Sequence, residues 1–347
     1  MAFSSYLTII IPALIAFAAT IAGSRFVSTY MLDSGVVSID HNKQKKPIVP
    51  ASGGLAVAFG FMLGMIAYIF GASFMLYVPA SSLTYLFATV LSVVLISVVG
   101  FLDDINVQRI KVKSTDMMDI RKGLKQWQKP VFTLIGAIPI MAINAGVSTI
   151  AIPLIGAVNF GIFYPLLIVP LAIIFVTNAF NLVGGFDGIG TGGGLVLSIG
   201  LVIYSLLFGT YTGVLISMVM VASLLAFLFF TAYPAKILPG DSLYFGFGAA
   251  FVAAVFIGNM EAFGVIIFIP YIIEFLLHAK KKFHTTDLGK LKKDNTFEPP
   301  YGKKISSWTH VFMNIKPMKE WEVSLWMWIV DAIFVLFGFA LKFAHLL

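Results

Sequence analysis

The 347-residue sequence contains no cysteine and few charged residues. Without cysteine the chain can form no disulfide bond, no cysteine-ligated zinc site and no thiol nucleophile. Charged residues make up 11% of the chain and hydrophobic residues 59%, whereas a typical soluble protein has about 25% charged residues. This scarcity of charge excludes a water-soluble enzyme, a disordered chain and a collagen-like fibre. The composition therefore predicts a polytopic membrane protein.

Ten apolar segments are long enough to be membrane-spanning helices, each of which needs about 20 mostly apolar residues. The predicted spans are residues 4–23, 52–73, 80–101, 130–146, 161–180, 191–208, 211–231, 243–257, 262–279 and 323–343. The short apolar segment 147–160 is expected to form a small external hairpin. The predicted fold is a single all-α transmembrane domain, residues 1–347, of about ten helices, with a long loop at 280–322.

Basic residues mark one side of the membrane. With ten spans, 22 of the 23 Lys and Arg residues fall in odd-numbered loops and none in even-numbered loops; the exception is Lys342 near the C-terminus. Cytoplasmic loops collect Lys and Arg, so we expect the odd loops in the cytoplasm and both termini outside it. The net charge of +7 could also suggest nucleic-acid binding, but its placement in alternate loops favours a lipid bilayer as partner and no nucleic acid.

Polar residues cluster at the predicted cytoplasmic ends of spans, where embedded polar groups are usually functional. Asp103 and Asp104 end the third span; they offer a metal ligand or a proton acceptor, or they are solvated acids that end the helix. Asn178 and Asn181 share a helix face, and Asp187 follows them among glycines. Those glycines allow either close approach to a ligand or close helix packing, and the neighbouring Asn and Asp residues favour the ligand.

Two further clusters complete this side. Asp241, before the eighth span, is placed to bind Mg²⁺, to cap the helix, or to do both. The ninth loop begins with a cationic patch, Lys280, Lys281, Lys282 and His284, which suits a pyrophosphate or is the ordinary charge of the cytoplasmic side. Because acids and amides suit a divalent cation and basic residues suit phosphates, the clusters together predict a Mg²⁺–diphosphate site at the cytoplasmic face.

The order and sidedness of these motifs resemble the polyprenyl-phosphate N-acetylhexosamine-1-phosphate transferases, glycosyltransferase family 4. The resemblance covers essentially the whole chain: DxNK…P…GG over residues 40–54, the Asp pair, NxxN, GD before span eight and the basic ninth loop. It implies transfer of a sugar 1-phosphate from a UDP-N-acetylhexosamine, expected to be UDP-N-acetylglucosamine, to a polyprenyl or dolichyl phosphate. UMP is released, in the first membrane step of lipid-linked glycan assembly. The implied cofactor is Mg²⁺, with Mn²⁺ as an alternative.

The same resemblance implies roles for individual residues. Asn181 and Asp241 would hold Mg²⁺ on the pyrophosphate. Asp103 and Asp104 match the acidic pair of the catalytic site, as a base or as positioning groups, and Lys129 matches the basic residue that opens span four. Eight residues are implied at the substrates, with Asn178 also supporting the metal site: Lys43, Gly53, Asn178, Asp187, Lys280, Lys281, Lys282 and His284.

Departures from the bacterial sequence pattern indicate which branch of the family the chain resembles. The sequence after NxxN reads GGFDG at residues 184–188 in place of DGxDG, and the ninth loop has no run of consecutive histidines. Both features favour the dolichyl-type branch over the phospho-N-acetylmuramoyl-pentapeptide type, and the expected location is an archaeal cell membrane. The third loop, residues 105–128, is longer than is usual in the family.

Two functions of other classes also fit a ten-span protein. A transporter or lipid flippase would concentrate ionisable groups near the membrane midplane, whereas here they gather at one face. A non-enzymatic membrane scaffold leaves the set of NxxN, GD and DD motifs unexplained. The sequence leaves the oligomeric state open, with a homodimer as one option.

Overall fold

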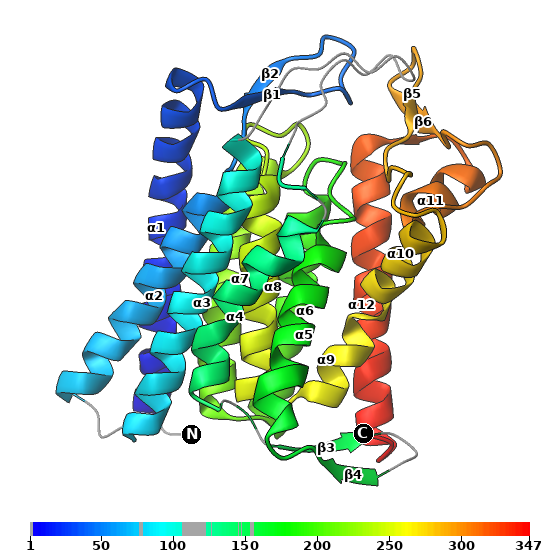
Figure 1. Cartoon of the computed structure of the whole chain (residues 1–347). Helices are drawn as coiled ribbons and strands as arrows, with labels where there is room; N and C mark the ends of the chain where they lie inside the picture. The colour runs from blue at the N-terminus through cyan, green and yellow to red at the C-terminus, as the bar shows by residue number, and fades with distance from the viewer. Residues whose placement is uncertain are drawn as a thin grey trace.

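The computed structural model describes residues 3–75, 79–105, 123–125, 127–144, 146, 148–152 and 156–347. Long helices run side by side through the molecule, and short strands lie at its two ends (Figure 1). The predicted helical membrane architecture is confirmed at this level.

The helices are α1 (Phe3–Asp33), α2 (Gly54–Met75), α3 (Ala80–Ile105), α4 (Gln128–Ala142), α5 (Val169–Phe180), α6 (Ile189–Phe208), α7 (Tyr211–Thr231), α8 (Gly240–Ile257), α9 (Glu261–Ile267), α10 (Ile269–Lys280), α11 (Trp308–Ile315) and α12 (Glu320–Phe343). A π-helical turn, η1 (Tyr164–Ile168), leads into α5. The strands form small antiparallel sheets: β1 (Val37–Ile39) with β2 (Ile48–Pro50), β3 (Thr149–Ile152) with β4 (Gly156–Asn159), and β5 (Lys290–Leu291), β6 (Thr296–Glu298) and β7 (Met318–Lys319) in that order.

Each of the ten predicted spans coincides with a helix, a helix and its π-helical turn, or a bent helix pair. Within the described residues, seven helices are long and apolar enough to cross a membrane: α1, α2, α3, α6, α7, α8 and α12. The pair α9 and α10 makes an eighth candidate, whereas α4 and the segment Tyr164–Phe180 are apolar but shorter. Ten crossings, the orientation of the termini and the single domain therefore stay predictions. Most of the predicted long third loop, 105–128, lies outside the described residues.

Two spans differ in shape from their predictions. Helix α1 runs on to Asp33, past the predicted end at residue 23, and stops where Gly35 adopts a φ of 72°, as is common at helix C-termini. The predicted span 262–279 is bent by 56° between α9 and α10. Pro270 lies in the first turn of α10, where its ring prevents α9 from continuing straight.

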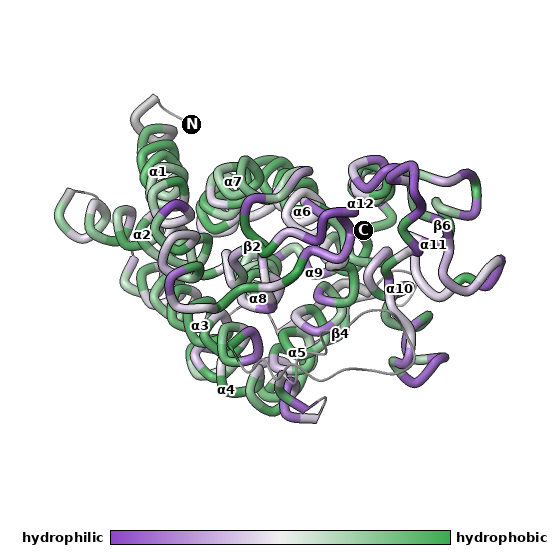
Figure 2. The backbone as a smooth tube through the Cα atoms, turned by 90° about the horizontal axis from the view of Figure 1, so that it is seen from above, coloured by the Kyte–Doolittle hydropathy of each residue, from purple (hydrophilic) through white to green (hydrophobic). Residues whose placement is uncertain are grey.

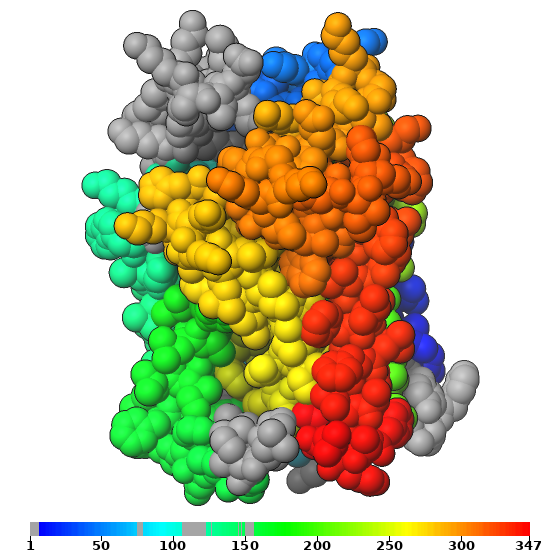
Figure 3. Space-filling model, turned by 90° about the vertical axis from the view of Figure 1, so that its right-hand side faces the viewer, coloured from blue at the N-terminus to red at the C-terminus, as the bar shows by residue number. Residues whose placement is uncertain are grey.

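Polar segments gather at one end of the bundle. The β1–β2 hairpin, the β5–β6–β7 sheet and α11 lie at the end opposite to the β3–β4 hairpin and both chain termini (Figure 1). Hydrophilic loops pass over the helix ends there (Figure 2), and the ninth-loop segment 281–319 lies over the upper part of α10 and α12 (Figure 3). The hairpin expected within 147–160 is confirmed, and its place beside the termini agrees with the predicted sidedness.

Helix α8 forms the centre of the packed core, since every residue from 242 to 257 is buried. Its small residues let neighbouring helices approach closely. A Cβ atom on Gly246 would lie 2.1 Å from Ser97 Oγ of α3, and one on Gly248 would lie 2.7 Å from Thr177 Cα of α5. This packing fixes α3 and α5 relative to the start of α8.

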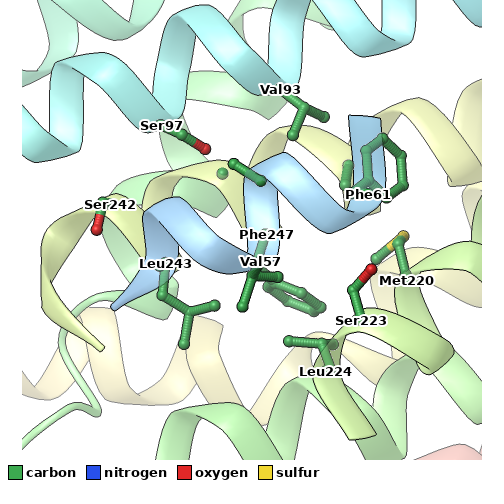
Figure 4. A pocket seen from close by; sticks show the side chains of 14 residues that line it. Val57, Phe61, Val93, Ser97, Met220, Ser223, Leu224, Ser242, Leu243 and Phe247 are labelled. Atoms are coloured by element: carbon green, nitrogen blue, oxygen red, sulfur yellow. The ribbon is translucent and has the colours of Figure 1, made fainter. Parts of the chain in front are cut away.

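A small cavity of about 20 Å³ lies among α2, α3, α7 and α8 (Figure 4). Ser97 and Ser223 line it, and their hydroxyl groups have no hydrogen-bond partner among the described residues. Its volume corresponds to about one water molecule. The cavity is too small for a substrate and belongs to the core.

Replacement of Gly100 by alanine is expected to destabilise the protein. A Cβ atom at Gly100 of α3 would lie 2.4 Å from the Asp241 carbonyl oxygen, so α3 and α8 would have to separate. We expect a loss of about 2 kcal/mol, measured as a lower midpoint of thermal unfolding in detergent. Gly71→Ala in α2 is the control, because no atom lies within 4 Å of a Cβ there. An unchanged midpoint for Gly100→Ala would contradict the close approach.

Candidate active site

Three helices bring one lysine and two carboxylates together. Asp103 lies near the end of α3, Lys129 in the first turn of α4 and Asp241 in the first turn of α8. The distances from Lys129 Nζ are 3.0 Å to Asp103 Oδ2 and 2.8 Å to Asp241 Oδ2. Asp103 also accepts a hydrogen bond from the Leu124 amide. Two predicted catalytic residues thus meet a predicted metal ligand.

Asn181 reaches the same cluster from the end of α5. Its side chain lies beside the Asp241 carboxylate, and both residues line one cavity. Asn178 instead donates from Nδ2 to the Ile174 carbonyl oxygen, at 2.8 Å. The structure therefore brings Asn181 to Asp241 and turns the amide of Asn178 to the backbone of its own helix.

Asp104 caps the start of α8 from a neighbouring helix. Asp104 Oδ1 accepts a hydrogen bond from the Asp241 amide at 2.8 Å. Its Oδ2 accepts from the Ser242 amide at 3.3 Å and from the Ser52 hydroxyl at 2.9 Å. Gly240 has a φ of 69°, and a Cβ atom there would lie 2.2 Å from Asp104 Oδ2. Because the first amides of a helix have no partner within it, Asp104 fixes Asp241. The sequence left capping of this helix open as a role for Asp241. In the structure Asp104 has that role.

Gly53 allows the first loop to approach the turn before α8. Its amide donates to the Leu238 carbonyl oxygen at 2.9 Å, and the Leu238 amide donates to the Pro50 carbonyl oxygen at 2.8 Å. A Cβ atom on Gly53 would lie 2.5 Å from the Phe227 ring. Gly53 thus has a packing reason to be glycine, and its predicted contact with substrate stays a prediction.

Lys43 of the first loop forms ion pairs with three carboxylates. Its Nζ lies 2.5 Å from Glu320 Oε2, 2.7 Å from Asp187 Oδ2 and 3.0 Å from Asp40 Oδ2. Burial lowers the pKa of the Lys43 amine, but the carboxylates of Glu320 and Asp187 outweigh burial and hold the pKa above its usual range. Lys43 and Asp187, both predicted at the substrate, are therefore in direct contact.

The turn after the NxxN motif, residues 184–188, is held by side chains from distant segments. Asp287 Oδ2 accepts hydrogen bonds from the amides of Gly184 at 3.1 Å and Gly185 at 2.7 Å. Burial raises the pKa of the Asp287 carboxyl, and the hydrogen bond from Gly185 opposes that rise. Asn42 Nδ2 donates to the Gly185 carbonyl oxygen at 2.6 Å. The backbone of this turn is thereby fixed.

A polar cavity of about 370 Å³ lies among these segments. Its lining includes the first loop at 38–42 and the turn at 184–188. Three predicted site residues, Asn181, Asp187 and Asp241, also line it. Ligand pockets typically have volumes of about 300–1,000 Å³, so the cavity has room for a small organic ligand.

The predicted cationic patch lies outside this lining. Lys280, Lys281, Lys282 and His284 are exposed side chains around the end of α10. Their contact with a phosphate group stays a prediction.

The glycines after the turn have a different role from the predicted one. A Cβ atom on Gly190 would lie 2.2 Å from the Tyr244 ring, and one on Gly192 would lie 2.0 Å from the Trp328 ring. Close helix packing, the reading that the sequence disfavoured, therefore explains these glycines of α6. Close approach to a ligand fits the turn at 184–188, which lines the cavity.

Sequence reasoning missed three residues of the site: Ser52, Asp287 and Glu320. Glu320 is 2% exposed, yet in the sequence it resembles the nearby Glu322, an ordinary acid at the start of the last span. Asp287 follows two threonines in the ninth loop, where polar residues are common. No spacing in the sequence distinguishes these side chains, because their partners are distant along the chain.

Carboxyl groups accumulate at this end of the bundle: Asp40, Asp103, Asp104, Asp187, Asp241, Asp287 and Glu320. The ion pairs described within this group come from Lys43 and Lys129. Among the residues that the structure describes, no three His, Asp or Glu side chains have the arrangement of a metal site. Asp241 and Asn181 nevertheless offer one carboxylate and one amide oxygen. This donor set fits Mg²⁺, which takes few protein ligands when water and phosphate supply the rest.

The helical membrane bundle and its acid–lysine cluster define an integral membrane enzyme. Residues 85–259 match the family model described as glycosyl transferase family 4. The chain belongs to glycosyl transferase family 4.

Relatives match most of the chain. A protein of Saccharolobus solfataricus is 32% identical over 97% of each chain, and one of Sulfolobus acidocaldarius is 28% identical over 96% of this chain and 95% of its own. Both carry the name UDP-N-acetylglucosamine–dolichyl-phosphate N-acetylglucosaminephosphotransferase. A phospho-N-acetylmuramoyl-pentapeptide-transferase of Clostridium perfringens is 34% identical over 51% of this chain and 54% of its own.

Removal of the Asp104 carboxylate is expected to destabilise the start of α8. Asp104→Ala leaves the partly buried amide of Asp241 and the buried amide of Ser242 without this acceptor. We expect a cost of about 2–3 kcal/mol, measured by thermal unfolding in detergent. Asp33→Ala is the control, because Asp33 is exposed at the end of α1. Equal unfolding midpoints for both variants would contradict the capping role.

Proposed function

We propose that this protein transfers N-acetylglucosamine 1-phosphate from UDP-N-acetylglucosamine to a dolichyl or other polyprenyl phosphate and releases UMP. Two archaeal relatives that align with almost the whole chain carry the name of this activity. The observation that carries the proposal is the meeting of Asp103, Lys129, Asp241 and Asn181 at one end of the bundle. A related UDP-N-acetylhexosamine is the alternative donor. The muramoyl-pentapeptide donor has weaker support, because the transferases of that name match 51% of the chain at 34% identity or 86% of it at 28% identity, against 97% at 32% identity for the Saccharolobus relative.

The charge of the site supports a divalent cation. A UDP-sugar carries a diphosphate, and a phosphate monoester is largely a dianion near neutral pH because its second pKa is about 6. Both substrates would meet a region with more carboxyl groups than lysines. We therefore assign Mg²⁺ as cofactor, with Mn²⁺ as an alternative, and Asp241 and Asn181 as its ligands. When bound, the ion would neutralise charge on the diphosphate.

In the proposed reaction, an oxygen of the lipid phosphate attacks the phosphorus that carries the sugar. The bond from that phosphorus to the bridging oxygen breaks, and UMP leaves with the bonding electrons. The product is a lipid-linked diphosphate sugar. Because the attacking phosphate is already anionic, no strong base is required, and the protein contributes mainly positioning and electrostatic stabilisation.

The contacts of Asp103 and Asp104 indicate different roles for these two carboxylates. Lys129 lies between Asp103 and Asp241, so its ammonium group can face the phosphates while Asp103 holds it in place. Asp104 accepts hydrogen bonds from the Asp241 and Ser242 amides. It therefore positions Asp241 and does not serve as the base.

An apolar cavity suits the lipid substrate. It measures about 350 Å³ and lies among α5, α8, α9 and α10, beside the bend in the α9–α10 pair. Its lining is rich in Phe, Val and Ile, for example Phe175, Val252 and Ile272. Branched hydrocarbon of a polyprenyl chain would bury apolar surface there.

The proposed enzyme works at the cytoplasmic side of an archaeal plasma membrane. The end that carries the site also carries the β1–β2 hairpin of the first loop and the lysine-rich ninth loop, and cytoplasmic loops collect such charge. A water-soluble UDP-sugar would meet a membrane lipid phosphate there.

Purified protein in detergent is expected to release UMP from UDP-N-acetylglucosamine and dolichyl phosphate only when Mg²⁺ or Mn²⁺ is present. Lys129→Met is expected to lower kcat by about 100-fold or more, as removal of a charge-stabilising group commonly does. Lys125→Met is the matched control, because this nearby lysine is exposed. The measurement is UMP formed per enzyme across a panel of UDP-sugars, which also identifies the sugar.

Other outcomes of this assay would contradict the proposal. No UMP from any UDP-sugar, together with measurable substrate counterflow in vesicles, would favour a transporter. Full activity after removal of divalent cations with a chelator would eliminate the proposed cofactor. Equal activities of the Lys129 and Lys125 variants would remove Lys129 from the mechanism.

A further inference from the structure

One face of α12 holds the turn that carries Asp187. Glu320, Ser324 and Trp328 are four residues apart, so they lie on the same side of the helix. Ser324 Oγ donates to the Asp187 carbonyl oxygen at 2.8 Å, and Trp328 Nε1 donates to the Ile189 carbonyl oxygen at 3.2 Å. A glycine at position 192 makes room for the Trp328 ring. Helix α12 thus contacts the start of α6 through this face.

Glu320 is the most connected member of this face. Its Oε1 accepts a hydrogen bond from the Asp187 amide at 3.0 Å and from Asn42 Nδ2 at 3.2 Å. Its Oε2 lies 2.5 Å from Lys43 Nζ. One carboxylate of the last helix therefore ties the first loop, 277 and 278 residues away in sequence, to the turn that carries Asp187.

Two of the three partners of Glu320 line the polar cavity. These are Asn42 and Asp187, whereas Lys43 and Glu320 itself do not line it. Among the described residues, its hydrogen-bond partners are Asn42, Lys43 and Asp187. None of them belongs to the Asp103–Lys129–Asp241 cluster. Loss of the Glu320 charge is therefore expected to weaken binding of the ligand in the polar cavity.

We propose that Glu320 is a positioning residue that fixes Asp187 and Lys43 for binding of the UDP-sugar. This inference rests on the proposed function, in which the polar cavity takes the soluble substrate. Glu320 holds both Lys43 and the Asp187 amide, and hydrogen bonds to charged groups are among the stronger ones. We therefore expect loss of its charge to lower the affinity for the UDP-sugar about tenfold, which corresponds to 1.4 kcal/mol.

The test compares Glu320→Gln with Glu322→Gln by steady-state kinetics in Mg²⁺. Glutamine keeps the size of the side chain and removes its charge. We expect the KM for UDP-N-acetylglucosamine to rise about tenfold or more in Glu320→Gln, with little change in the KM for dolichyl phosphate. Glu322→Gln is the matched control, since Glu322 caps the Lys319 amide on the same helical turn and pairs with Lys316 away from the cavity. It should retain both wild-type constants.

A double variant with Lys43 distinguishes a positioning role of Glu320 from an effect on folding stability. If Glu320 acts through Lys43, the double variant Glu320→Gln/Lys43→Met should have nearly the KM of Lys43→Met alone. A purely structural role would instead lower the folded fraction and leave the KM unchanged. Should Glu320→Gln fail to fold, Glu320→Asp keeps the charge but withdraws it from Lys43 and the Asp187 amide by one methylene group, and we expect a KM raised about threefold.

The outcomes distinguish this inference from the proposed function. Wild-type protein that releases no UMP would overturn the proposed function, and the role of Glu320 with it. Active wild-type protein with an unchanged KM in Glu320→Gln, or in Glu320→Asp if that variant is needed, would overturn the role of Glu320 alone. An equal rise in the KM for dolichyl phosphate would also overturn it.

Discussion

Crowding of carboxyl groups at one end of the bundle is the constraint on which the site depends. Seven such groups lie in the site region, and Lys43 and Lys129 form ion pairs with five of them. Buried charges are stable only when they are paired or hydrogen-bonded. The structure satisfies this requirement with helix amides at Asp104, turn amides at Asp287 and lysines at the two ion-pair clusters.

The acids have two overlapping roles. Asp104, Asp287 and Glu320 hold backbone amides and thereby fix the start of α8 and the turn at 184–188. Asp187, Asp241 and Asp287 line the cavity on or beside those fixed segments. Hydrogen bonds from backbone amides to these acids explain how a site assembled from loops and helix ends keeps one geometry. Such preorganisation is the main contribution that the protein makes to phosphoryl transfer.

The sequence predicted the helices well because hydropathy and charge act locally, over the length of one span. It also indicated Asp103, Lys129, Asn181 and Asp241, which the structure brings together. It could not predict that Gly192 makes room for Trp328, because this contact joins helices far apart in the chain. The bend at Pro270 was missed for a similar reason: an apolar run has the same hydropathy whether it is straight or bent.

Binding of the anionic substrate to this carboxylate-rich site requires positive charge from outside the protein. The most direct test is the affinity for UDP-N-acetylglucosamine, measured by titration calorimetry at increasing Mg²⁺ concentration and without lipid acceptor. The account predicts tight binding in Mg²⁺ and loss of affinity by at least about tenfold, or 1.4 kcal/mol, when a chelator removes the ion. It further predicts that Asp241→Asn abolishes this Mg²⁺ dependence. Equal affinity with and without Mg²⁺ in the wild-type protein would contradict the account.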